Sequence, residues 1–240
     1  MKVKLISTTQ NLLDVLFTSA RTCYNAGSPI DMFEEVGNIP RDKKLKLING
    51  CIKSSHLSVL EHSQFTFAIE GVSRSLLAQI SRHRVAVSLS VQSQRYVNLE
   101  GTFDYVTPKA LQDEGDLQGY FAECMQQAYE SYTELINKGV KPEDARAVLP
   151  NACCTNMVIT LNLRSLIHLC NERLCTRAQL EIRQLVQLMV KEVLKENEWL
   201  KPYLQPKCES LGYCPEYKGC GRKLVITNWL TKYNNGGILK

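Results

Sequence analysis

The spacing of apolar and polar residues divides the chain into strand-like and helix-like segments. Residues 2–7 and 64–70 alternate between apolar and polar positions, as half-buried strands do, and further strands are predicted over 103–106 and 152–163. Apolar residues recur at helical spacing in seven segments, which are residues 10–24, 41–54, 74–84, 116–138, 141–146, 164–175 and 177–199. Strands and helices do not alternate regularly, and no Gly-x-Gly-x-x-Gly motif occurs. The sequence therefore predicts an α+β fold with a mixed, mainly antiparallel sheet and packed helices, not a Rossmann fold.

Glycine, proline and serine mark the expected boundaries of these elements. Gly71 is expected to end the strand over 64–70, and Ser73 is expected to cap the helix that follows it. Residues 25–40 are rich in glycine and proline and predict a loop with a helical turn near 31–36, a candidate mobile lid. We expect one domain over residues 1–205, with residues 206–240 as a Cys- and Gly-bearing C-terminal extension of that domain.

The stretch from Gln79 to Tyr96 is basic and contains no carboxylate. Its cationic or near-cationic side chains are Arg82, His83, Arg84 and Arg95. Burying such ions without a partner costs several kcal/mol for each ion, so an anionic ligand is expected to complete the stretch. The spacing predicts a helix that ends near Arg84, then a loop whose serine hydroxyls and amides accompany Arg95, a donor set suited to phosphate. A solvated basic turn is the alternative, and the apolar residues interleaved through the stretch disfavour it.

Composition narrows the classes of function. The chain has 240 residues, of which 44% are hydrophobic and 22% charged, an ordinary balance for a globular protein. The formal net charge of +5 suits small anionic substrates at least as well as nucleic acid. No run of about 18 apolar residues occurs, so no membrane span is expected. The N-terminus does not have the pattern of a secretion signal, and we expect a cytoplasmic protein with reduced cysteines.

The histidines gather in segments that mix polar and apolar residues. These segments are residues 56–62, 79–96, 143–150 and 162–179, and the four histidines of the chain, His56, His62, His83 and His168, all lie within them. A single histidine is more often a structural boundary residue, but this clustering favours one shared polar site. The spacing of His56 and His62 does not match a His-Glu-x-x-His motif, and no metal site is expected there.

The segment 162–179 supplies a second group of cations. Arg164 and His168 are four residues apart and share a helix face. Arg164 also lies at a switch from strand to helix, where the helix N-terminal amides favour anions. A surface helix with Glu172 and Glu181 as partners is the alternative. No poised nucleophile with its own base is apparent in the chain, so covalent catalysis by the enzyme is not expected.

Three cysteines in the extension, Cys208, Cys214 and Cys220, are equally spaced. They are compatible with three zinc ligands completed by a distant fourth, and so with a zinc-dependent interaction protein. The usual Cys-x-x-Cys pairs are missing, which favours a surface extension with reduced thiols and no metal.

Several motifs in order resemble those of the flavin-dependent thymidylate synthases. They are Ala20-Arg21-x-x-Tyr24, His56…Glu61-His62, Gln79-x-x-Arg82-His83-Arg84, Ser93-Gln94-Arg95-Tyr96, Arg146…Leu149-Pro150, Asn162-x-Arg164, and Arg173 with Ala178-Gln179. Eight residues separate Arg84 from Ser93, the longer of the family's two spacings. The resemblance covers residues 20–179.

This resemblance implies an enzyme that methylates dUMP to dTMP. The carbon would come from 5,10-methylenetetrahydrofolate and the hydride from FADH2, regenerated by NADPH. It also implies a homotetramer with sites at subunit interfaces, small-molecule partners (dUMP and folate), and neither nucleic acid nor membrane as a partner. A basic nucleic-acid-binding module is the alternative, and the even spread of Asp and Glu outside the four segments disfavours it.

The resemblance also implies a role for individual residues. The residues expected to bind FAD are Ser58, Glu61, Arg82, His83, Arg84, Asn162, Arg164 and His168, although the family often has Asn at the last position. The residues expected to bind dUMP are Gln79, Ser93, Gln94, Arg95, Arg146 and Arg173. The expected catalytic residues are Arg173, which would polarise the uracil ring, His56, near flavin and folate, and Ser93.

Overall fold

The structure is a computed structural model that describes residues 1–97, 99 and 102–225. Part of the predicted extension, residues 226–240, therefore lies outside the described residues. The chain forms two compact units. We call residues 1–8 and 65–161 the sheet unit, and residues 9–64 together with those from 162 onward the helical unit. The prediction of one domain with an extension stays a prediction.

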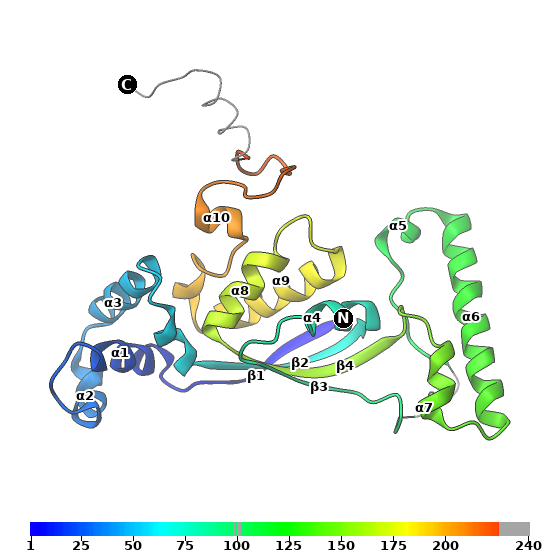
Figure 1. Ribbon diagram of the computed structural model, residues 1–240, viewed down its shortest axis with the longest axis horizontal. Coiled ribbons are helices and arrows are strands. Elements are labelled where there is room, and N and C mark those ends of the chain that lie inside the picture. Colours follow the sequence, from blue (N-terminus) through cyan, green and yellow to red (C-terminus); the bar gives the residue numbers. More distant parts are fainter. Residues whose placement is uncertain (98, 100–101, 226–240) are drawn as a thin grey trace, which may run out of the picture. The chain divides into compact units, whose positions relative to one another are not determined.

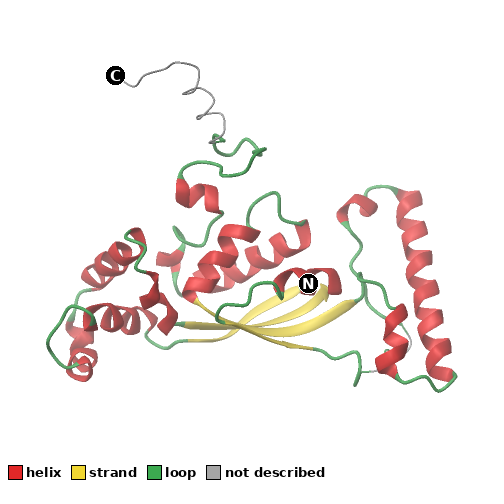
Figure 2. Cartoon of the chain, viewed as in Figure 1, coloured by secondary structure: helices red, strands yellow, loops and turns green. Residues whose placement is uncertain are grey.

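The sheet unit contains a four-stranded sheet in the order β1-β2-β4-β3 (Figure 1). Its strands are β1 (Lys2–Thr8), β2 (Gln64–Ser73), β3 (Val87–Val91) and β4 (Cys154–Asn162). The pairs β1/β2 and β3/β4 are antiparallel, with Lys2 opposite Glu70 and Val87 opposite Leu161. Figure 2 shows this sheet in yellow beside helices in red, and the α+β prediction is confirmed.

Alternate residues of the two central strands are buried, as the two-residue period of a strand requires. In β2 the side chains of Phe65 and Phe67 are fully buried, and in β4 those of Ile159 and Leu161 are almost fully buried. The residues between them are more exposed. The apolar face of the sheet therefore fixes the register of the two strands that flank the candidate site residues.

The helices of the sheet unit are α4 (Arg74–Ile80), α5 (Lys109–Gln112), α6 (Gly115–Asn137), α7 (Pro142–Ala145) and the 3-10 turn η3 (Arg146–Val148). Met125 of α6 packs with Phe103 and Cys153 in a small buried cluster. Cys153 directly precedes β4, so this cluster links α6 to the sheet. α6 is 23 residues long, but no helix in the described part of the chain has the length and apolar character needed to cross a membrane.

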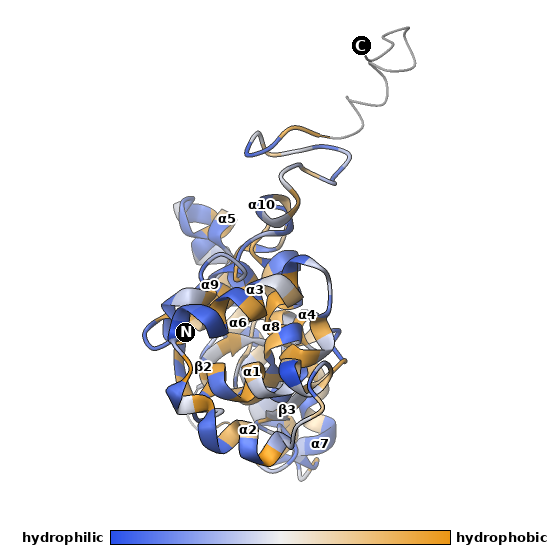
Figure 3. Ribbon diagram, turned by 90° about the vertical axis from the view of Figure 1, so that its left-hand side faces the viewer, coloured by the Kyte–Doolittle hydropathy of each residue, from blue (hydrophilic) through white to orange (hydrophobic). Residues whose placement is uncertain are grey.

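The helical unit is built from amphipathic helices, in which hydrophobic and hydrophilic residues alternate along the ribbon (Figure 3). Its elements are α1 (Leu12–Thr22), α2 (Pro29–Glu35), η1 (Val36–Asn38), α3 (Arg41–Lys53), η2 (Leu57–His62), α8 (Leu163–Arg173), α9 (Leu180–Leu194), η4 (Glu198–Leu200) and α10 (Lys207–Leu211). α1 contacts α3, and the buried ammonium of Lys44 pairs with Asp14 at 2.6 Å across this contact.

Two predictions about the basic stretch are wrong. The helix that begins at Arg74 ends at Ile80 rather than near Arg84. The segment predicted as loop contains β3, because Val87, Leu89 and Val91 alternate with serines and pair with β4.

Three other predictions need correction. β2 continues through Gly71, whose positive φ of 68° glycine tolerates and whose N–H donates to Asn156 Oδ1 at 3.0 Å. Residues 25–40 contain more helix than the single turn predicted near 31–36, since α2 and η1 lie within them. Residues 103–106 form no strand, and only an isolated bridge joins Tyr105 to Cys153.

The cap of α4 yields a prediction about stability. The buried Ser73 hydroxyl accepts the Leu76 N–H at 3.0 Å, as the sequence predicted. Ser73→Ala should lower the free energy of unfolding by about 1 kcal/mol, because one N-terminal amide of α4 loses its acceptor. Urea denaturation measures this loss. Ser81→Ala, at the exposed end of the same helix, is the matched control and should change the value by less than about 0.5 kcal/mol; equal losses would contradict the capping role.

Candidate functional site

Arg82, His83 and Arg84 lie in the turn between α4 and β3. The side chains of Arg82 and Arg84 are exposed, and among the described residues neither forms an ion pair with a carboxylate. Ala86 closes the turn with a left-handed φ of 51°, a conformation that costs a non-glycine residue about 1 kcal/mol. The turn therefore presents two cations that no carboxylate of the described chain segments neutralises.

The loop after β3 carries Ser93, Gln94 and Arg95. The Ser93 hydroxyl accepts the Arg95 N–H at 3.1 Å, and the Arg95 guanidinium lies over the Tyr96 ring, 5.4 Å from its centroid. Arg95 Nε and Nη2 both contact Glu143 Oε2, at 2.9 and 2.7 Å. The loop is thus held in place by its own serine and by a carboxylate 48 residues further along the chain.

Glu143 also contacts Arg146, which the sequence predicts to bind dUMP. Glu143 lies in α7, and its backbone carbonyl accepts Arg146 Nε at 2.9 Å. Arg95 and Arg146 therefore both contact Glu143, Arg95 through its carboxylate and Arg146 through its backbone carbonyl, although the two arginines are distant in sequence. Both are exposed, so their charges remain available to a ligand.

Arg74 lies close to this group and was missed by the sequence analysis. Its Nη2 donates to the Gln92 carbonyl at 2.8 Å, while its Nε is buried and has no hydrogen-bond partner within residues 1–97, 99 and 102–225. Burial lowers the pKa of Arg74, and the nearby charge of Arg146 lowers it further. A positive charge in the first turn of a helix interacts unfavourably with the helix dipole. The position of Arg74 at the start of the predicted helix could therefore have indicated a functional role.

Gln94 and Arg74 both contact Cys153. The Gln94 Nε2 lies 3.8 Å from Cys153 Sγ, and the Arg74 N–H donates to the Cys153 carbonyl at 3.1 Å. Burial raises the pKa of the Cys153 thiol, and this keeps the group neutral beside the two side chains. The predicted substrate residue Gln94 and the half-buried cation Arg74 therefore share Cys153 as a neighbour.

A second group of predicted residues lies in the helical unit, where η2 and α8 meet. The Asn162 side chain caps α8 by accepting the Ser165 N–H at 2.8 Å. Arg164, in the first turn of α8, forms an ion pair with Glu61 of η2. The buried Ser63 hydroxyl donates to the Leu60 carbonyl at 2.7 Å and accepts the Leu163 N–H at 3.3 Å. These contacts hold η2, which carries Glu61, against α8, which carries Arg164.

The remaining predicted residues of the helical unit lie on the same two elements. Ser58 belongs to η2, and His56 immediately precedes it; both are exposed. His168 is exposed one helical turn after Arg164, and the half-buried Arg173 is the last residue of α8. An arginine there also stabilises the carboxyl end of the helix dipole.

The predicted residues thus form two sets, one in each unit. The set of the sheet unit is Gln79, Arg82, His83, Arg84, Ser93, Gln94, Arg95 and Arg146. The set of the helical unit is His56, Ser58, Glu61, Asn162, Arg164, His168 and Arg173. Within each set the residues come from neighbouring elements and carry mainly cationic and hydroxyl or amide groups, a chemistry that suits phosphate and carbonyl oxygens.

Metal chemistry has no visible support at these residues. In the part of the chain that the structure describes, no group of three or more His, Cys, Asp or Glu side chains is arranged to hold a metal ion. The ten cysteines, all within that part, are free thiols.

Comparison with known proteins identifies relatives that match most of the chain. The family described as "Thymidylate synthase complementing protein" matches residues 4–197. The flavin-dependent thymidylate synthase of Nitratidesulfovibrio vulgaris is 42% identical over 236 residues, covering 92% of this chain and 94% of that protein. That of Clostridium tetani is 39% identical over 239 residues, with the same two coverages.

A solved structure agrees with these relatives. The flavin-dependent thymidylate synthase ThyX of Helicobacter pylori, solved in complex with FAD and dUMP, has a TM-score of 0.65 and 27% sequence identity. The match covers 83% of this chain and 97% of that chain. The order of the motifs, the fold and the extent of these matches agree: the chain belongs to the family of flavin-dependent thymidylate synthases.

Proposed function

We propose that this protein catalyses the reductive methylation of dUMP to dTMP. The carbon would come from 5,10-methylenetetrahydrofolate, and the reducing hydride from FADH2 that NADPH regenerates. The family assignment and the dUMP and FAD bound by the Helicobacter pylori relative support this proposal. The observation that carries it is the convergence of Arg95 and Arg146 on Glu143 beside Ser93.

We assign the phosphate of dUMP to Arg95 and Arg146. The Arg95–Glu143 ion pair is partly exposed, with side-chain exposures of 48% and 36%. Exposed ion pairs contribute at most about 1 kcal/mol, so a phosphate dianion can replace the Glu143 carboxylate at low cost. Arg74, with its buried and unpartnered Nε, is a further cation on this side of the substrate. Gln79, Ser93 and Gln94 complete the proposed dUMP set.

The donor chemistry of both sets fits FAD. The proposed FAD residues are Arg82, His83 and Arg84 in the sheet unit, and Ser58, Glu61, Asn162, Arg164 and His168 in the helical unit. The exposed Arg82 and Arg84 suit a diphosphate, because neither has a carboxylate partner among the described residues. Arg164 adds a cation in the first turn of α8, where backbone amides also favour anions.

Arg173, His56 and Ser93 are the proposed catalytic residues. Reaction at C5 of uracil develops negative charge on the C4 carbonyl oxygen, and Arg173 would stabilise that charge by about 3 kcal/mol. His56 is assigned to the surroundings of the flavin and folate. Ser93 is assigned as a donor to the substrate rather than a nucleophile, since its hydroxyl is already ordered by the Arg95 N–H. No covalent bond between enzyme and substrate is needed in this scheme.

The assembly and the compartment are also proposals. Most of the proposed binding cations are exposed on the single chain, which favours completion of each site by another subunit in a homotetramer. The cytoplasmic location expected from the sequence stays a prediction.

The activity itself is tested by following NADPH oxidation with added FAD, dUMP and 5,10-methylenetetrahydrofolate. The proposal expects dTMP to form only in the complete mixture. NADPH oxidation without dTMP in the complete mixture would refute it.

Removing Arg164 should weaken flavin binding with little effect on stability. Arg164→Ala deletes a charge-assisted contact worth about 1.5–3 kcal/mol to an anionic ligand, so FAD affinity should fall about 10- to 100-fold. The exposed Arg164–Glu61 pair contributes at most about 1 kcal/mol to folding. Titration of flavin fluorescence and urea denaturation measure the two effects. Arg41→Ala, an exposed arginine at the start of α3, should change neither.

Removing Arg95 should reduce the preference for dUMP over deoxyuridine. Arg95→Ala should weaken dUMP binding about 10- to 100-fold, while deoxyuridine binding should stay the same because it lacks the phosphate. Calorimetric titration of both ligands measures the ratio. Arg95→Lys should recover part of the preference for dUMP, since Lys keeps the positive charge but not the two parallel N–H donors of the guanidinium. Equal losses for the two ligands would show that Arg95 does not contact the phosphate.

Ser93→Ala distinguishes a binding role from a nucleophilic one. We expect a several-fold rise in KM for dUMP with kcat largely retained, because a neutral hydrogen bond is worth about 1 kcal/mol. Steady-state assays of dTMP formation separate the two constants. Loss of all turnover, with dUMP affinity and fold intact, would instead assign the hydroxyl to the chemical step.

A further inference from the structure

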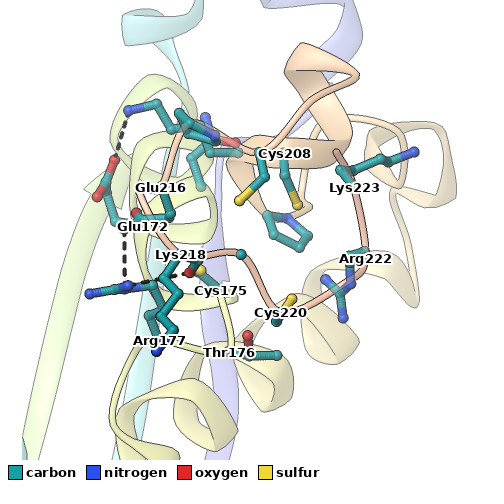
Figure 4. Close-up of a pocket in the computed structure, with 16 residues that line it drawn as sticks. Glu172, Cys175, Thr176, Arg177, Cys208, Glu216, Lys218, Cys220, Arg222 and Lys223 are labelled. Carbon is teal, nitrogen blue, oxygen red and sulfur yellow. Dashed lines mark hydrogen bonds and ion pairs between the residues drawn. The ribbon is translucent and has the colours of Figure 1, made fainter. Parts of the chain in front are cut away.

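Four cysteines of the helical unit line a single pocket (Figure 4). Cys175 comes from the turn after α8, and the other three, Cys208, Cys214 and Cys220, come from the extension. The sequence analysis noted the spacing of the last three, but nothing in the sequence placed Cys175 with them. None of these thiols has a part in the proposed reaction.

Polar contacts hold the extension along the end of α8 and the turn that follows. Four of the contacts that connect the two segments are Arg177 Nη1 to the Lys218 carbonyl at 3.4 Å, Ser210 Oγ to Asn171 Oδ1 at 3.4 Å, Lys207 Nζ to Glu172 at 3.5 Å, and Arg177 Nε to Glu216 at 3.1 Å. Figure 4 shows the last two as dashed lines at one side of the pocket. The thiols are therefore brought together by two separate segments that are already joined through charged side chains.

Cys220 is chemically distinct from the other cysteines of the pocket. It is exposed, and a hydrogen bond with the Thr176 side chain lowers the pKa of its thiol, aided by the Arg222 N–H and guanidinium charge. Burial instead raises the pKa of the Cys208 thiol, and Cys214 is 7% exposed. A thiolate is the reactive form of cysteine, so Cys220 is the thiol of this pocket most open to attack on an electrophile.

We propose that Cys220 is a thiol oxidation site whose oxidised form is captured by Cys175 as a disulfide. Cys175 is the chosen partner because it is adjacent in sequence to Thr176, which contacts Cys220, and because its side chain lines the same pocket. The other two thiols are less suitable, since Cys208 favours the protonated form and Cys214 is buried. This inference does not depend on the proposed reaction.

The oxidant is a hydroperoxide, and the two steps balance. The Cys220 thiolate attacks the outer oxygen of the peroxide, the O–O bond breaks, and the alkoxide or hydroxide leaves with a proton from solvent. This step gives a sulfenic acid. The Cys175 sulfur then attacks the Cys220 sulfur, the S–O bond breaks, and water leaves. Two thiols have lost two electrons and two protons, and the peroxide has been reduced to an alcohol and water, or to two water molecules when it is hydrogen peroxide.

The disulfide would tie the extension covalently to the turn that follows Arg173. A cross-link that closes a long loop restricts the unfolded chain, so the oxidised protein should have a higher Tm than the reduced one. Reduction by a dithiol should reverse the rise. Cys220→Ser and Cys175→Ser should each remove it.

The test treats the full-length protein with hydrogen peroxide and maps disulfides by mass spectrometry of a digest made without reductant. The expected product is a peptide pair linked through Cys175 and Cys220. Cys175→Ser should leave a sulfenic acid at Cys220 that dimedone traps, and Cys220→Ser should give neither product. Cys23→Ser is the matched control, because Cys23 is an exposed cysteine outside the pocket, and it should leave the linkage unchanged.

Three results would overturn the proposal. One is equal dimedone labelling of Cys23 and Cys220 in the Cys175→Ser variant, which would show ordinary exposed thiols. Another is a peroxide-induced disulfide that excludes Cys220. The third is stoichiometric zinc in the purified protein with all four pocket thiols blocked to alkylation, which would make the pocket a metal site.

Discussion

The candidate site depends on one constraint, which is that several of its arginines have no full counter-charge among the described residues. A guanidinium without a counter-charge is tolerated only where water or an anion reaches it. The structure meets this condition by leaving Arg82 and Arg84 exposed in a turn and by pairing Arg95 with a partly exposed carboxylate. Arg74 meets it only in part, because its Nε is buried without an acceptor among the described residues. In the proposed complex, the phosphate of the substrate would supply the negative charge and the acceptors that these guanidinium groups lack.

The sheet makes this concentration of charge possible. β3 pairs with β4, and this pairing fixes both the turn before β3 and the loop after it. β1, the two central strands β2 and β4, and the long helices could be predicted, because their apolar periods run over many residues. The five residues of β3 could not be distinguished from a site loop, since their alternation of Val or Leu with Ser is short and their partners in β4 lie 66 to 74 positions away.

The residue types of the candidate site were predictable, but their arrangement was not. Ordered motifs indicated Arg95 and Arg146, whereas their shared contact with Glu143 is set by the position of α7 and has no local signal. Arg74 matched no motif, and only its position at the start of a helix marked it. The equal spacing of the extension cysteines was visible in the sequence, but their convergence with Cys175 required the docking of the extension on α8.

A structure of the protein with FAD and dUMP bound tests the central claim most directly. The claim is that the cations of the sheet unit are completed by the anionic groups of the two ligands. The account predicts Arg95 and Arg146 within hydrogen-bond distance of the dUMP phosphate, and Arg82 or Arg84 on a phosphate of FAD. Ligands bound with all four arginines still facing water would contradict it.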